Sequence, residues 1–302
     1  MGLFSKPDTH SVLLIDIASS SVGIGLSGIR DGALPELVFT VRIPFGYKTD
    51  FDLVHIEPAM MLALHSALGI AHREGARLLG QKGYPGSINH AVISFSSPWY
   101  ASALGRDHQG FRNRLEERFG SPVEVFESEN GLMSAVERRL AKKVEEAVIR
   151  AFGVKEGIGL SSFTFSFARV AKHAFADLEP AVFADMTGHM TDMLSMHSGE
   201  FKQKMSVPVG THTLSREADM PWNAFWKKLS GEHAEEFHHG NVFLIADNYE
   251  LGRAHLTELF PDARVISFGA SRGFIDEMVQ SAPSTVPIER LAILAAYSNL
   301  FL

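Results

Sequence analysis

Cysteine is absent from this chain of 302 residues, which excludes disulfide bonds, thiolate zinc sites and cysteine nucleophiles. Long apolar runs are also missing: the longest, 291–302, is well short of the roughly 20 residues of a membrane-spanning helix. Residues 1–7 lack the apolar length of a signal peptide. We therefore expect a cytoplasmic protein, and leave open a position at the inner face of the membrane.

Positive charge is in the minority, with 28 Lys and Arg against 35 Asp and Glu and a formal net charge of −7. Such a surface repels nucleic acid and anionic lipid at long range. The sequence therefore predicts no nucleic-acid partner and at most weak or indirect membrane contact. The C-terminal segment 287–302 agrees, because a helix on a membrane surface needs a basic face and Arg290 is the only cation in this segment.

What the chain does contain is an alternation of strand and helix signals, typical of an α/β protein. Apolar runs and alternating patterns predict strands at 11–17, 22–26, 37–43, 91–95, 181–186, 190–197, 201–209, 242–246 and 264–268. Helical periodicity predicts helices at 51–79, 131–152, 214–229 and 251–260. Residues 166–176 are expected to form a strand and a short helix.

Two segments about half a chain apart, 13–32 and 182–201, share one pattern. Each has a buried strand that ends near an aspartate, then a turn of small residues, a second strand and a hairpin turn. Backbone N–H groups and hydroxyls of such a turn can bind phosphate oxygens, while the aspartate can hold hydrated Mg²⁺. Each segment alone is also compatible with a plain β-hairpin. The duplication favours two lobes that hold a nucleotide phosphate between them.

These motifs resemble those of the actin-like ATPase superfamily, and within it the FtsA and PilM families of cell division and type IV pilus assembly. Residues 16–22 (DIASSSV) are similar to its first phosphate motif and 185–192 (DMTGHMTD) to its second. The resemblance implies an actin-like, ribonuclease H-like fold, with two duplicated mixed β-sheet lobes flanked by helices around a central cleft. The implied parts are a first lobe (1–100), a shortened inserted segment (101–130), a connecting helix and strand (131–180), a second lobe (181–286) and a C-terminal helix that docks on the first lobe (287–302).

The resemblance further implies that ATP and Mg²⁺ bind in the cleft, with Asp16 and Asp185 as metal-binding and catalytic residues. The implied nucleotide-binding residues are Ser19, Ser20, Ser21, Thr187, Gly188, Thr191, Asp192, Gly210 and Asp247. It implies a scaffold that contacts division or pilus-assembly proteins or copies of itself, and that is at most a weak ATPase.

The chain departs from the family pattern at several glycines. Ala18 and Thr187 stand where the family usually has glycine, and 246–248 (ADN) replaces the glycine pair of its adenosine motif. A side chain at these positions would occupy space where the backbone approaches the ligand. Two alternatives therefore stay open. One is a degenerate scaffold that binds no nucleotide, and the other is a small-molecule kinase of the same superfamily in which an aspartate acts as general base.

Overall fold

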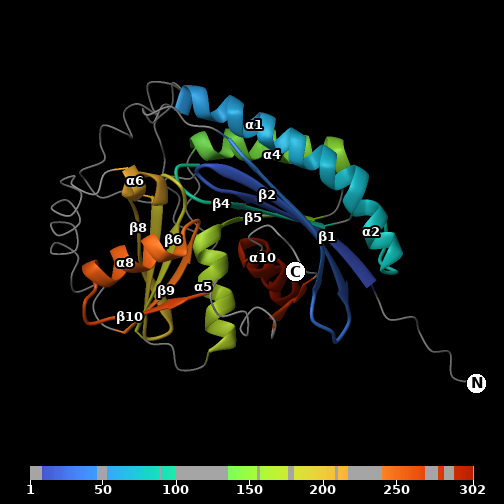
Figure 1. Ribbon diagram of the computed structural model, residues 1–302. Coiled ribbons are helices and arrows are strands. Elements are labelled where there is room, and N and C mark those ends of the chain that lie inside the picture. The colour runs from blue at the N-terminus through green and yellow to red at the C-terminus, as the bar shows by residue number, and fades with distance from the viewer. Residues whose placement is uncertain are drawn as a thin grey trace, which may run out of the picture.

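The computed structural model describes residues 9–45, 53–88, 90–99, 135–154, 157–175, 180–207, 210–216, 240–268, 278–281 and 289–301. The segment 101–130 and most of the predicted helix 214–229 lie outside these ranges. Figure 1 shows two β-sheets with helices between them and on their outer faces. Among the described residues, no helix combines the length and the apolar character that crossing a bilayer requires.

The first lobe is built on a six-stranded mixed sheet with the order β11-β3-β2-β1-β4-β5. Its strands are β1 (Thr9–Ile17), β2 (Ser21–Arg30), β3 (Glu36–Pro44), β4 (His90–Phe95), β5 (Gly157–Ser162) and β11 (Gln280–Ser281). β1 pairs antiparallel with β2 and parallel with β4. Because β1 lies inside the sheet and is covered on both faces, residues 12–15 form an unbroken apolar run, and all residues from Ser11 to Ile17 are buried.

The second lobe repeats this arrangement in a five-stranded sheet with the order β10-β9-β6-β7-β8. Its strands are β6 (Ala181–Met186), β7 (Thr191–His197), β8 (Glu200–Val207), β9 (Asn241–Ala246) and β10 (Arg264–Ser267). The order β8-β7-β6-β9-β10 matches β3-β2-β1-β4-β5, with the same antiparallel and parallel pairs. The predicted duplication and the two-lobed fold class are thus confirmed.

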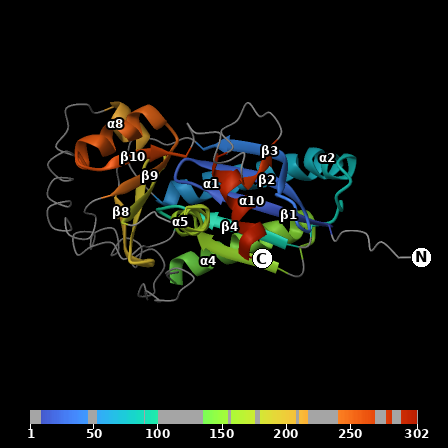
Figure 2. The ribbon, with the colours of Figure 1, turned by 90° about the horizontal axis from the view of Figure 1, so that it is seen from below.

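Helices form three layers around the sheets. They are α1 (Leu53–Ile70), which continues through the π-helical turn η1 (Ala71–Gly75) into α2 (Ala76–Gln81), then α4 (Ala135–Phe152), α5 (Phe163–Ala174), α6 (Thr211–Arg216), α8 (Tyr249–Leu259) and α10 (Glu289–Phe301). In Figure 1, α1 and α4 cover the outer face of the first sheet and α8 covers that of the second. Figures 1 and 2 both show α5 between the two sheets with α10 beside it.

The buried apolar residues form three clusters that the two sheets separate. Ile15 and Ile17 of β1 pack with α1 and α4 on the outer face of the first sheet. Leu14, on the opposite face of β1, shares the central cluster with α5, α10 and the inner face of the second sheet. The C-terminal helix, expected to dock on the first lobe, thus packs in a core that both sheets line.

The prediction for residues 166–176 is wrong in detail. A strand, β5, precedes this segment, and α5 fills most of it. The alternating phenylalanines at the start of α5 imitate a strand pattern, but Phe163 and Phe167 are four residues apart and lie together on the buried helix face. Ser162 caps the helix, because its hydroxyl accepts a hydrogen bond from the Phe165 N–H at 3.3 Å. Packing and capping therefore outweigh the local β-propensity.

Candidate functional site

The two predicted aspartates occupy equivalent positions in the two lobes. Asp16 lies near the end of β1 and Asp185 near the end of β6. Side chains alternate along a strand, so Asp16 faces the same way as Leu14 and Asp185 the same way as Phe183, and both of these apolar residues belong to the central cluster. Both carboxylates therefore point into the layer between the sheets, and both are fully buried.

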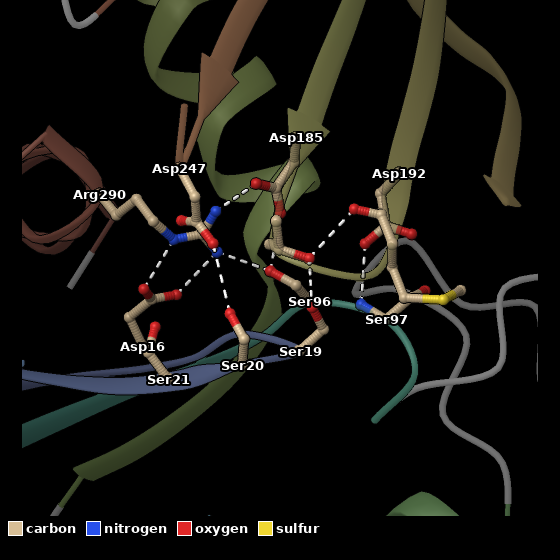
Figure 3. Close-up of polar contacts among 12 residues, drawn as sticks. Asp16, Ser19, Ser20, Ser21, Ser96, Ser97, Asp185, Asp192, Asp247 and Arg290 are labelled. Atoms are coloured by element: carbon tan, nitrogen blue, oxygen red, sulfur yellow. Dashed lines mark hydrogen bonds and ion pairs between the residues drawn. The ribbon is translucent and has the colours of Figure 1, made fainter. Parts of the chain in front are cut away.

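Arg290 of α10 lies between these two carboxylates (Figure 3). Its Nε and Nη2 donate to the two carboxylate oxygens of Asp16 at 2.6 and 2.8 Å, and its Nη1 donates to Asp185 Oδ1. Nη2 also donates to Ser96 Oγ at 2.6 Å, and Ser96 Oγ donates to Asp185 Oδ2 at 2.7 Å. The guanidinium carbon lies 3.7 Å from the ring centroid of Phe163. The arginine is thus bonded to both lobes and stacked on α5.

A second arginine, Arg42 of β3, also binds Asp16. Asp16, Gly23 and Arg42 are neighbours across β1, β2 and β3. Arg42 extends over Gly23 and donates to Asp16 Oδ2 at 2.6 Å and to Ser21 Oγ at 2.8 Å. A Cβ atom at position 23 would lie 2.6 Å from Arg42 Nη2. The glycine therefore provides the space through which Arg42 reaches Asp16.

Asp192 of β7 makes another link between the lobes. The backbone N–H of Ser97, which follows β4, donates to Asp192 Oδ2 at 2.8 Å. The Ser97 hydroxyl donates to Ser206 Oγ of β8 at 2.9 Å, and Ser206 in turn donates to Asp192 Oδ1. All three residues are buried. This carboxylate, like the other two, is satisfied by groups of the chain itself.

The two small-residue turns contact each other directly. Ser19 Oγ of the first turn and Thr187 Oγ1 of the second are 2.7 Å apart, and the His189 N–H donates to Ser19 Oγ at 3.0 Å. A Cβ atom at Gly188 would lie 2.5 Å from Ser20 Oγ. The turns that were predicted to hold phosphate from two sides are thus in contact with one another.

The remaining predicted site residues surround these turns, with one exception. Asp247 follows β9, and its Oδ2 accepts from Ser20 Oγ at 3.4 Å. Gly210 precedes α6, and a Cβ atom there would lie 2.5 Å from the His189 nitrogen. Thr191 differs, because it pairs with Met186 and shares its face, whereas the central layer lies on the other side of the sheet. Below, the lobe junction means Asp16, Ser19–Ser21, Arg42, Ser96, Ser97, Asp185, Thr187–His189, Asp192, Ser206, Asp247 and Arg290.

The charges of the lobe junction affect the two aspartates in opposite directions. Burial alone would raise the pKa of Asp16, but the charges of Arg290 and Arg42 outweigh it and hold the pKa below its usual value. Burial raises the pKa of Asp185 to about 6, with Arg290 opposing the rise and Asp192 adding to it. Burial would also lower the pKa of Arg290, but Asp16 and Asp185 raise it above its ordinary value, so the guanidinium stays charged.

Comparison with known proteins identifies the fold. No protein-family model and no curated protein matches the sequence. Among solved structures, the PilM–PilN type IV pilus biogenesis complex matches with a TM-score of 0.56 at 13% identity, over 95% of this chain and 98% of that one. A Bacteroides thetaiotaomicron protein of actin-like ATPase fold and unknown function matches with a TM-score of 0.51 at 10% identity, over 94% and 95% of the two chains. The chain has the actin-like ATPase fold. It resembles PilM in this respect, as its two phosphate-type motifs predicted.

Mg-ATP, which the actin-like fold implies, does not fit the lobe junction as it is arranged here. The carboxylates that would hold hydrated Mg²⁺ accept hydrogen bonds from Arg290, whose charge lies between them. The turns that would hold the phosphates touch through Ser19 and Thr187. Within the described part of the chain, no three His, Asp or Glu side chains are grouped as a metal site. A nucleotide would have to separate the turns and displace the arginine.

Several residues of the lobe junction were not predicted. They are Arg42, Ser96, Ser97, Ser206 and Arg290. Arg290 did leave a signal in the sequence, because it is the only cation in a largely apolar C-terminal helix. A helix that is apolar on all sides is expected to be buried, and a buried arginine needs carboxylate partners. The two duplicated aspartates were the obvious candidates.

Proposed function

We propose that this chain is an actin-like scaffold of the FtsA and PilM type, which acts through protein contacts and needs no bound nucleotide. The observation that carries the proposal is the pairing of both duplicated carboxylates with Arg290. Because Asp16 and Asp185 are bonded to the chain's own cation, neither is available to a metal ion or as a general base. A protein with this fold whose two duplicated carboxylates are both paired in this way is best suited to binding other proteins.

The proposed partners are proteins of type IV pilus assembly or cell division. The PilM–PilN complex of pilus biogenesis, which this chain resembles in fold, supports the first of these. Copies of the same chain are a further class of partner. We propose that the protein works in the cytoplasm at the inner face of the membrane, which it reaches through its partners. Its net charge of −7 disfavours direct binding to anionic lipid or nucleic acid.

Both rival functions require ATP. A Mg-ATP-dependent scaffold needs the two turns apart, whereas Ser19 and Thr187 lie in hydrogen-bond contact. A small-molecule kinase needs a carboxylate that can take a proton from a substrate hydroxyl, whereas Asp16 is bonded to two arginines. These contacts favour the nucleotide-free scaffold over both rivals.

Calorimetric titration with Mg-ATP separates the three functions. We expect no binding heat at millimolar nucleotide, either for the wild type or for Asp16→Ala. Tight binding that is lost in Asp16→Ala would support the Mg-ATP-dependent scaffold. Transfer of phosphate to an added sugar or carboxylate would support the kinase. Either of these results would overturn the proposal.

A second experiment tests the partners themselves. The full chain is co-expressed with each pilus-assembly and cell-division protein of its own genome, and complexes are isolated with and without Mg-ATP. We expect a stable complex with at least one of these proteins, in equal yield under both conditions. A complete set of pairs without any complex would contradict the scaffold function, whatever the result of the titration.

A further inference from the structure

We propose that Arg290 replaces the metal and nucleotide of an actin-like fold, so that the seating of α10, and not a bound ligand, keeps the two lobes together. This inference rests on the proposed function only in taking the lobe junction to be free of nucleotide. The identity of the partners does not enter it.

The position of Arg290 sets it apart from an ordinary ion-pairing residue. It belongs to neither set of duplicated strands, but to the C-terminal helix α10. Its hydrogen bonds run to Asp16 and Ser96 of the first lobe and to Asp185 of the second. One buried side chain therefore joins three parts of the molecule that are distant in sequence.

Charge explains why this position suits a cation. Two buried carboxylates that face one layer repel each other unless positive charge lies between them. A bound metal ion can supply that charge, and here the guanidinium of Arg290 does so, with directed hydrogen bonds to both carboxylates. An arginine cannot lose its proton in a protein, so this charge is permanent.

The seating of α10 and the contact between the lobes depend on each other. The apolar residues of α10, such as Leu291 and Leu294, are buried in the central cluster with Phe167 of α5 and Phe183 of β6. Withdrawal of α10 would remove Arg290, which would leave Asp185 without this cation and Asp16 with Arg42 alone. Separation of the lobes would in turn deprive the buried arginine of Asp185. Withdrawal of α10 therefore destabilises the contact between the lobes, and separation of the lobes destabilises the seating of α10. The two are reciprocally coupled.

The other contacts of the lobe junction are compatible with one closed arrangement only. The Ser19 to Thr187 contact lies in the turns, and the Ser97 to Asp192 hydrogen bond lies at the end of β4. Both require the lobes at the spacing that Arg290 bridges. They add specificity to the closed form, and the hydrogen bonds of Arg290 tie that form to α10.

The absence of cysteine allows a direct test. Leu62 of α1 is 69% exposed and Thr257 of α8 is exposed, so Leu62→Cys and Thr257→Cys can carry one spin label on each lobe of the full chain. The distance between the labels is measured by electron–electron double resonance. We expect one narrow distance in the parent protein, unchanged by millimolar Mg-ATP. Arg290→Ala should give a broader distribution that extends to longer distances.

Two further variants complete the experiment. Asp185→Asn removes the charged partner in the second lobe and leaves the Asp16 pairing intact, so it should broaden the distribution while α10 stays seated. If Arg290→Ala does not fold, the result for Asp185→Asn decides the test. Asn299→Ala, at an exposed position of α10, is the matched control and should keep the narrow distance. A narrow distance in Asp185→Asn, or a shift of the parent distance by Mg-ATP, would overturn the inference, and neither result bears on whether partners bind.

Discussion

The two lobes place an aspartate at the same point of the same strand order, yet the two carboxylates have different surroundings. Asp16 binds both Arg42 and Arg290, and its pKa lies below the usual value. Asp185 has Arg290 as its cation and lies near Asp192, and burial raises its pKa to about 6. Duplication thus sets where the two carboxylates lie, while residues outside the duplicated segments, such as Arg42 and Arg290, shift their pKa values. Arg290 is therefore held more strongly by Asp16 of the first lobe than by Asp185 of the second.

Arg290→Ala should have the largest effect on stability, because it removes the cation that both carboxylates share. Breaking a buried ion pair by removal of one partner typically costs about 3–5 kcal/mol of unfolding free energy. Denaturant unfolding of the variant and the wild type measures the difference. Asn299→Ala, on the same helix, should change stability by less than about 0.5 kcal/mol. A loss below about 1 kcal/mol in Arg290→Ala would mean that the arginine contributes little.

Replacing each aspartate by asparagine tests the difference between the lobes. Asp16→Asn removes the carboxylate that Arg42 and Arg290 share, and should lower the unfolding free energy by about 3 kcal/mol. Asp185→Asn should cost less, about 1–2 kcal/mol, because a neutral amide also removes the repulsion from Asp192. The same unfolding assay gives the order. Equal losses, or a larger loss in Asp185→Asn, would contradict the assignment of the stronger anchor to the first lobe.

Two glycines test how closely the turns are packed. A Cβ atom at Gly210 would lie 2.5 Å from the backbone nitrogen of His189, and backbone cannot easily move aside. At Gly188 the nearest atom is the movable hydroxyl oxygen of Ser20. Gly210→Ala should therefore cost about 1–3 kcal/mol, as overpacking typically does. Gly188→Ala should cost less, and thermal unfolding of the pair checks this. The reverse order would show that the turns are packed differently.

The pKa directions predict opposite pH dependences for the two carboxylates. Folding raises the pKa of Asp185 from 3.8 to about 6, so its contribution to stability is lost as the pH rises through this range. Folding lowers the pKa of Asp16 below 3.8, so its contribution is present above that value and lost as the pH falls. Melting temperatures measured from acid to neutral pH test this. The wild type should lose stability relative to Asp185→Asn as the pH rises, and relative to Asp16→Asn as the pH falls. Parallel curves would contradict the pKa assignments.

The fold and more than half of the lobe junction could be predicted because their signals are local. Apolar runs, small-residue turns and the repeated aspartates lie within about 20 residues of each other in each lobe, as the segments 13–32 and 182–201 show. The cations could not be predicted in the same way. Arg42 reaches Asp16 only because strand register places Gly23 between them, and Arg290 is brought in by a helix 274 positions further along the chain. These contacts depend on tertiary structure, which a local pattern does not encode.

A double-mutant cycle between Arg290 and Asp185 in nucleotide-free buffer tests the central claim most directly. Unfolding free energies of the wild type, Arg290→Ala, Asp185→Asn and the double variant give the coupling between the C-terminal helix and the second lobe. If the arginine holds the lobes together, the coupling energy should lie between about 1 and 3 kcal/mol. Additivity of the two single changes to within about 0.3 kcal/mol would contradict the claim.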